Sequence, residues 1–280
     1  DCKFNIGIKG RDFHVIFSRS YGAIISLKYG GREMIDRPIM PNFWRAPTDN
    51  DRGNNMSWRN AQWKIASLYA KSTNIELRKE VNSATVIYTY ELPTIPKTCC
   101  NISYTVYGDG EIKVSMSYAG ESGLPDMPAF GVTFKIPADY ENLEWYGNGP
   151  EETYSDRKHG ARLGIFRNKV GDNLANYVIP QECGNKTDIR WAKLVDNRGF
   201  GLEIVGDGNI EFSALPYTSH ELENAFHHYE LPPVQHTVIN VHKKQMGVGG
   251  DDSWGALPHP EYLIPSDRPM VLEFSIRAIR

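Results

Sequence analysis

Apolar and polar residues alternate with a period of two over much of this 280-residue chain. The clearest runs, in which every second residue is aliphatic or aromatic, span residues 13–17, 84–92, 112–118 and 130–136. Further runs span residues 143–147, 200–205, 209–215, 236–242 and 270–277. Successive side chains of a strand point to opposite faces of a sheet, so this alternation is typical of antiparallel strands with one buried face. The pattern predicts an all-β chain and excludes a βαβ fold.

Glycine-rich turn signals separate the alternating runs at residues 30–31, 108–110 and 206–208. Two segments break the period and predict short helices. The first is residues 57–70, whose apolar stripe is formed by Trp58, Ala61, Ile65, Leu68 and Tyr69. The second is residues 218–228, which start with Thr218 and Glu221 at capping-box spacing. With no repeat, low-complexity tract or linker, residues 1–280 are expected to form one large antiparallel sandwich domain with one or two short helices.

Charge and hydropathy exclude some functions. The 31 Lys and Arg residues against 34 Asp and Glu residues give a net charge of −3, which argues against binding to nucleic acid or to an anionic membrane surface. No apolar run approaches the roughly 18–20 residues of a transmembrane helix. The four cysteines include the adjacent pair Cys99 and Cys100, a spacing that suits neither a structural bridge nor a metal knuckle. We therefore expect free thiols.

Three stretches carry polar and aromatic residues that a plain strand or turn does not need: residues 41–54, 145–157 and 247–254. In the last, Trp254 follows a glycine-rich segment that predicts a surface loop. An indole on a loop can stack on the apolar C–H face of a sugar. It can equally fold back as a plug of the core, and the residues alone leave both readings open.

Asp49 and Asp51 have the spacing that begins a calcium loop. The frame is not completed, because Asn60 stands where the bidentate Glu would be, so we expect no metal there and read the segment as an Asx-turn loop. The sequence contains no P-loop, no Gly-x-Ser-x-Gly elbow and no His-Glu-x-x-His motif. The residues by themselves thus indicate a large β-sandwich with aromatic, polar loops that suit a carbohydrate.

Four segments, in order along the chain, resemble signatures of the C-terminal domain of family 2 β-galactosidases. Residues 43–53 resemble the signature near the start of that domain, and residues 146–157 match its Gly-Pro-x-Glu-x-Tyr-x-Asp-Arg segment. Residues 180–185 resemble its Pro-x-Glu-x-Gly run, with Cys183 where Asn is expected. Residues 246–255 resemble its Gly-Gly-Asp-Asp-Ser-Trp motif. Together the four matches run through practically the whole chain.

The resemblance implies a galactose mutarotase-like super-sandwich and hydrolysis of terminal β-galactosides such as lactose. In that family two glutamates of a TIM barrel, earlier in the protein, act in a retaining double displacement. The barrel's β/α alternation is absent here, so no catalytic residue is expected in these 280 residues. Because the chain also starts without Met, we expect a C-terminal piece or a small subunit, inactive alone.

The resemblance also implies roles for single residues. Trp254 matches a tryptophan that reaches the active site and stacks on the sugar. Residues 48–54 match a mobile active-site loop, with Gly53 as a hinge; its members of interest are Thr48, Asp49, Asn50, Asp51 and Gly53. Three further residues either line a sugar groove or brace the structure, and the sequence leaves this open: Arg45, Arg157 and Glu182.

The expected partners are the rest of the β-galactosidase chain or a large subunit, and a galactoside; homo-oligomerisation stays open. No cofactor is evident. Free thiols suit the cytoplasm, although a missing N-terminal region would hide a signal for the periplasm or for secretion. Two other functions compete. A free-standing aldose 1-epimerase would need a His and a Glu, for which His159 or His236 with Glu182 are the candidates. The other is a non-catalytic carbohydrate-binding or assembly module.

Overall fold

The computed structural model describes residues 1–252 and 254–280. In these residues the strands are β1 Asn5–Lys9, β2 Phe13–Ser18, β3 Ala23–Tyr29, β4 Arg32–Glu33, β5 Arg37–Asn42, β6 Lys71–Lys79, β7 Ser83–Leu92, β8 Thr98–Tyr107, β9 Ile112–Tyr118, β10 Ala129–Pro137, β11 Asn142–Gly149, β12 Arg162–Lys169, β13 Lys186–Val195, β14 Gly201–Leu215, β15 His236–Gln245 and β16 Met270–Ile279. The α-helices are α1 Asp49–Gly53, α2 Met56–Arg59, α3 Ala61–Tyr69 and α4 Ser219–Asn224. Short 3-10 turns are η1 Val170–Asn173, η2 His228–Glu230 and η3 Pro260–Tyr262.

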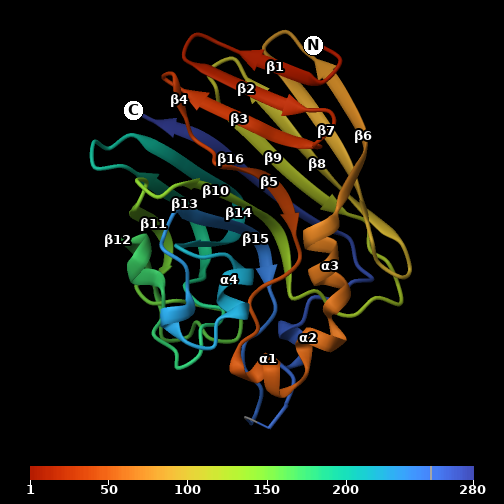
Figure 1. Cartoon of the computed structure of the whole chain (residues 1–280), viewed down its shortest axis with the longest axis vertical. Helices are drawn as coiled ribbons and strands as arrows, with labels where there is room; N and C mark the ends of the chain where they lie inside the picture. Colours follow the sequence, from red (N-terminus) through yellow and green to blue (C-terminus); the bar gives the residue numbers. More distant parts are fainter. Residues whose placement is uncertain (253) are drawn as a thin grey trace.

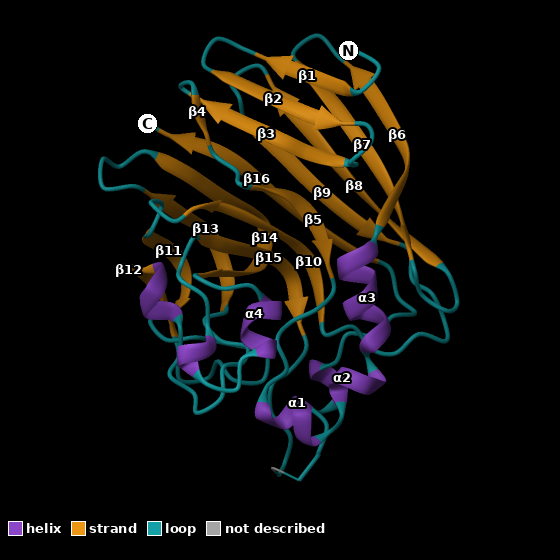
Figure 2. Ribbon diagram, viewed as in Figure 1, coloured by secondary structure: helices purple, strands orange, loops and turns teal. Residues whose placement is uncertain are grey.

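The strands form two antiparallel sheets. A small sheet has the order β1-β2-β3-β4, and a twelve-stranded sheet has the main order β12-β11-β13-β14-β16-β9-β8-β7-β6, with β15, β10 and β5 branching from β14 (Figure 1). Figure 2 shows the small sheet lying across the β7–β9 part of the large one. The helices gather at the opposite end of the molecule. The chain is therefore an all-β antiparallel sandwich, as the alternation predicts.

The core lies where the two sheets face each other. Phe17 of β2 is fully buried, and its ring centroid lies 5.7 Å from that of Tyr104 on β8. The hydroxyl of Tyr88 on β7 donates to the carbonyl of Ser18 at 3.0 Å, so the phenol finds a partner without leaving the interface between the sheets. The predicted inward positions, such as Val15, are buried, while their polar neighbours reach solvent in part.

The predicted helix over residues 57–70 is two helices, α2 and α3, separated at Asn60. The Asn60 side chain donates to the carbonyl of Asp126 at 2.6 Å, which holds the break in place. The predicted apolar stripe does not face the core: Trp58 is 85% exposed, whereas Trp63 and Ala66 are fully buried. Trp63 turns inward because its indole N–H reaches the carbonyl of Pro125 at 2.7 Å while its ring packs on Phe43.

The turn predicted at residues 206–208 is also absent, because β14 runs through it without a break. Up to Gly206, β14 pairs with β16; from Glu211 it pairs with β15. Its register with β13 shifts between Ile189 and Trp191. The glycines thus allow an irregular bend at which the strand changes partners, which is a common use of glycine inside strands. No helix in the described part of the chain has the length and apolar character needed to cross a membrane.

Candidate functional site

The first and third of the polar stretches meet because of strand direction. β5 and β15 are both antiparallel to β10, so they run the same way and leave the sheet at the same edge. Figure 2 shows both strands pointing toward the end of the molecule that carries α1 and α2. Residues 43–54 follow β5, and residues 246–255 follow β15. Two segments separated by about 200 residues in sequence thus start side by side.

Hydrogen bonds join these two stretches to each other and to the second one. The Asn50 side-chain amide donates to the carbonyl of Val248 at 3.2 Å. The backbone N–H of Gly249 donates to a carboxylate oxygen of Asp156 at 2.9 Å. A Cβ added at Gly255, which has a φ of +110°, would come within 2.9 Å of the carbonyl oxygen of Gly53. The structure therefore brings all three predicted stretches into one loop cluster.

Arg45 ties the cluster together from inside. Its guanidinium is buried and contacts both carboxylate oxygens of Asp51, at 3.1 and 3.0 Å. It also donates to the carbonyl of Met246 and, at 2.8 Å, to that of Gly247. Thr48 is the N-cap of α1 and forms a capping box with Asp51, which accepts from the backbone N–H of Thr48 at 3.0 Å and whose own N–H donates to the Thr48 hydroxyl. Arg45 thus braces both loops within this chain.

The other residues of the 48–54 segment are held mainly by side-chain contacts. Asp49 exchanges two hydrogen bonds with Gln181, through its backbone N–H at 2.9 Å and its carboxylate at 3.0 Å. Arg52 pairs with Asp49 at 3.2 Å and donates to the carbonyl of Pro180. Gly53 is the last residue of α1. The segment expected to be an Asx-turn loop is therefore a one-turn capped helix. The Asp51 carboxylate nevertheless accepts a backbone N–H, which is the contact that the Asx-turn interpretation predicts.

Trp254 projects from the end of this cluster and is 88% exposed. Its backbone N–H donates to a carboxylate oxygen of Asp252 at 2.8 Å, and the N–H of Ala256 contacts the same oxygen at 3.3 Å. His259 lies 2.8 Å from Asp251, and this hydrogen bond raises the pKa of the histidine. Ser253, inside the same motif, lies outside the described residues. In this chain, then, Trp254 is not a plug of the core.

Glu182 and Arg157 line one small hollow of about 170 Å³, together with Asn50, Tyr154 and Tyr177. Glu182 is buried, and its Oε1 accepts from the Tyr154 hydroxyl at 3.3 Å and from the side-chain amide of Gln245 at 3.2 Å. Burial raises the pKa of Glu182 to about 7, against the opposing charge of Arg45. Arg157 does not pair with Glu182; its carboxylate partner is Glu152.

A second buried carboxyl, Glu211, was not singled out from the sequence. It accepts from the side-chain amide of Asn185 at 2.9 Å and from the backbone N–H of Gln245 at 3.1 Å, and burial raises its pKa to about 7. Nearby, burial lowers the pKa of His242 to about 3. Every position at the end of β14 is buried in the structure. A carboxyl in that part of the strand is the signal that could have identified Glu211.

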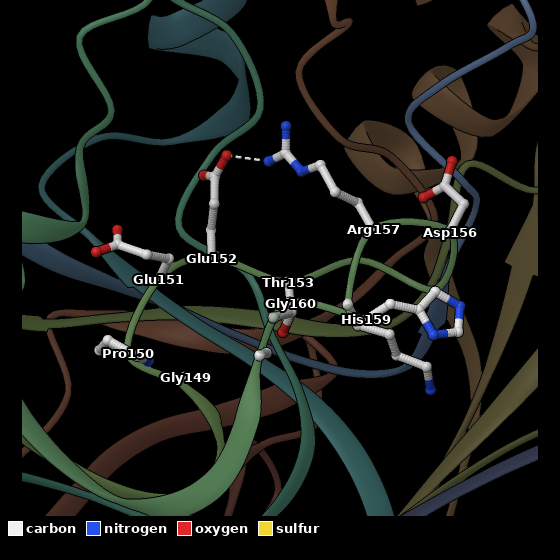
Figure 3. Close-up of a pocket in the computed structure, with 11 residues that line it drawn as sticks. Gly149, Pro150, Glu151, Glu152, Thr153, Asp156, Arg157, His159 and Gly160 are labelled. Atoms are coloured by element: carbon white, nitrogen blue, oxygen red, sulfur yellow. Dashed lines mark hydrogen bonds and ion pairs between the residues drawn. The ribbon is translucent and has the colours of Figure 1, made fainter.

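A larger hollow of about 560 Å³ lies against residues 149–161 (Figure 3). Figure 3 shows His159, Asp156 and the Glu152–Arg157 ion pair around it. Glu182 does not line this hollow. His236, the other histidine considered for an epimerase, contacts Asp36 at 2.9 Å. Neither histidine shares a described hydrogen bond or hollow with Glu182.

Cys183 lies in a small apolar cluster with Ala46, Leu215 and Leu222, under the loop cluster. Burial raises the pKa of its thiol to about 12, so it is an unreactive part of the packing. All four cysteines are free thiols, as the sequence predicts.

The fold of the chain resembles that of galactose mutarotase-like β-sandwich proteins. Galactose 1-epimerase from Lactobacillus acidophilus NCFM superimposes with a TM-score of 0.55 over 98% of this chain and 93% of that one, at 8% identity. At such identity the likeness concerns the fold alone.

The sequence comparisons then specify the family. The family model described as "Beta galactosidase small chain" matches residues 9–276, and the chain belongs to that family. A β-galactosidase of Halalkalibacterium halodurans is 47% identical over 98% of this chain and 28% of its own length. A β-galactosidase small subunit of Latilactobacillus sakei is 35% identical over 97% of this chain and 94% of its own. The chain thus spans about a quarter of the long relatives it matches and nearly all of the small subunit.

Proposed function

We propose that this chain completes the galactoside-binding site of a family 2 β-galactosidase, with Trp254 stacking on the sugar. The supporting observation is an indole that is almost fully exposed yet sits on a braced loop. An exposed aromatic ring is favourable when a ligand covers it, and the C–H face of a pyranose is a suitable partner. The 48–54 segment lies beside that loop and would close one side of the site.

In this proposal the two catalytic glutamates lie on a barrel outside these 280 residues and act in a retaining double displacement. This chain contributes binding and exclusion of water, and it is inactive as a hydrolase alone. The substrates are terminal β-galactosides of the lactose type. The likeness to a separate small subunit supports the same division of labour between two chains.

The partner would be the rest of the β-galactosidase, either in the same polypeptide or as a large subunit. Ile65, Leu68 and Tyr69 form one exposed face of α3, at i, i+3 and i+4. Exposed apolar groups of this kind mark interaction sites on soluble proteins. The long relatives are more than three times the length of this chain, so they have the polypeptide needed to cover this face.

The test is Trp254→Ala in the assembled enzyme, measured with lactose and with an aryl galactoside. Loss of a stacked ring costs about 1–2 kcal/mol, so we expect KM to rise roughly 5- to 30-fold for at least one substrate while the fold survives. The matched control is Trp58→Ala, because Trp58 is equally exposed but lies on α2. Unchanged kinetics with both substrates would assign Trp254 a structural role only.

The epimerase alternative has its own assay. The 280-residue chain alone is tested for interconversion of α- and β-galactose in a coupled mutarotation assay. We expect no rate above the buffer blank, because neither His159 nor His236, the histidines considered for this activity, lines a described hollow together with Glu182. A robust rate would replace the proposal.

A further inference from the structure

Lys186 is a buried lysine whose amine faces the ring of Trp145 but has no carboxylate partner among the described residues. It begins β13, it is 2% exposed, and its Nζ lies 5.1 Å from the centroid of the Trp145 ring. Within the described residues no hydrogen bond or ion pair engages this Nζ. Burying an ammonium without a counter-ion is costly, so this site disfavours the charged form.

The nearest carboxylates do not compensate for this burial. Glu152 is occupied by Arg157, by the Tyr177 hydroxyl and, at 2.6 Å, by the backbone N–H of Gly184. Burial lowers the pKa of Lys186 to about 8, against the opposing charges of Glu152 and Glu151. At pH 7.5 about a quarter of such amines are neutral, compared with roughly one in a thousand for an ordinary lysine.

The amine has space in front of it. Lys186 and Trp145 line a hollow of about 540 Å³, which is large enough for a small hydroxylated molecule. The hollow is also lined by carboxylates and amides that can accept and donate to hydroxyl groups: Glu151, Asp172, Asn168 and Asn176. A nucleophile, a cavity and groups that hold hydroxyls thus come together, apart from the loop of Trp254.

We propose that Lys186 is a carbonyl-reactive lysine, and that its cavity takes a small hydroxylated aldehyde such as the open-chain form of an aldose. The neutral amine attacks the aldehyde carbon and forms a C–N bond. One amine hydrogen goes to the carbonyl oxygen to give a carbinolamine. The second hydrogen leaves with that hydroxyl as water, which gives an imine. The step balances without an oxidant or reductant, and it is reversible. It is independent of the function proposed for Trp254.

The test is reductive trapping on the 280-residue chain. Glycolaldehyde or D-galactose is added with cyanoborohydride at pH 7.5, and labelled lysines are identified by peptide mass spectrometry at low conversion. Lys193 is a matched internal control, since its Nζ lies 4.5 Å from the Trp191 ring centroid, but its side chain is 35% exposed and its Nζ lies 3.9 Å from Glu144 and 3.8 Å from Glu203. We expect Lys186 to label at least 10-fold faster than Lys193, and labelling to saturate with aldehyde.

Labelling of Lys193 at an equal or greater rate, or no label on Lys186, would overturn the proposal. The pH profile is a second readout on the unmodified chain, taken as the ratio of Lys186 to Lys193 labelling so that the pH dependence of the hydride step cancels. This ratio should fall above about pH 8, because the Lys186 amine is already mostly neutral there. A ratio that does not change up to pH 10 would contradict the proposal. Lys186→Arg, which retains the charge but forms no imine, should abolish the label, with circular dichroism as the check of folding.

Discussion

The Arg45–Asp51 pair offers the sharpest test of how the loop cluster is held. Asp51→Asn removes the carboxylate beneath a guanidinium that is 1% exposed. Breaking one side of a buried ion pair costs about 3–5 kcal/mol, because the other charge stays buried without compensation. Arg45 keeps the carbonyls of Met246 and Gly247, so we expect the lower end, about 3 kcal/mol. In urea unfolding this lowers the midpoint by roughly 1 M if the m-value is about 3 kcal/mol/M.

Asp49→Asn is the matched control. Asp49 lies two residues away on the same helix, but its side chain is 66% exposed and its ion pair with Arg52 is a surface one, worth about 0–1 kcal/mol. If Asp51→Asn costs less than about 1 kcal/mol, no more than the control, then Arg45 does not brace the loops by charge. The double change of Arg45→Met with Asp51→Leu should recover much of the loss, because it leaves no unpaired buried charge.

Two further predictions concern the buried carboxyls and the helices. Glu182 and Glu211 have pKa values raised to about 7, so their protons are held more tightly in the folded chain than in the unfolded one. The free energy of unfolding should therefore fall by about 3 kcal/mol for each group as pH rises from about 4.5 to 7, and then level off. In urea titrations at pH 5 and pH 8, Glu182→Gln should remove roughly half of this difference. A difference that the substitution leaves unchanged would contradict the assignment. Trp63→Ala should cost about 3–5 kcal/mol in the same assay, whereas Trp58→Ala should change stability by less than about 0.5 kcal/mol; equal losses would contradict the packing of α3.

The alternation of residues predicts the strands well where only one face of a strand is buried. β9, for example, alternates between buried and half-exposed positions over its whole length. At β14 the alternation over residues 200–205 and 209–215 predicts strand correctly, but it divides one strand into two. The glycines at residues 206–208 have the composition of a turn, whereas the structure keeps them inside β14, where the strand changes its partner from β16 to β15. A period of two reports only the contrast between a solvent-exposed and a buried face, so it does not distinguish such a bend from a turn.

The helical stripe fails for a related reason. A pattern of apolar residues predicts that they face the core, but α3 buries Trp63 and leaves Leu68 and Tyr69 exposed. Residues at an interface with another polypeptide are apolar, as residues of the core are. The sequence of one chain therefore does not distinguish an interface residue from a core residue. That this apolar face of α3 is exposed and not part of the core emerges only from the structure.

The candidate site shows the limit most clearly. Sequence identifies the members of the loop cluster through four motifs, but not that Arg45 reaches the carbonyls of Met246 and Gly247, some 200 positions away. That contact depends on β5 and β15 both pairing with β10, which is a matter of long-range topology. Once the pairing is known, the role of each motif changes: the Arg45 motif contributes a brace, and the motif of Trp254 contributes the surface that the brace holds in place. If Trp254 binds a sugar as proposed, a substitution at Arg45 should consequently act on that binding only through the loop between them.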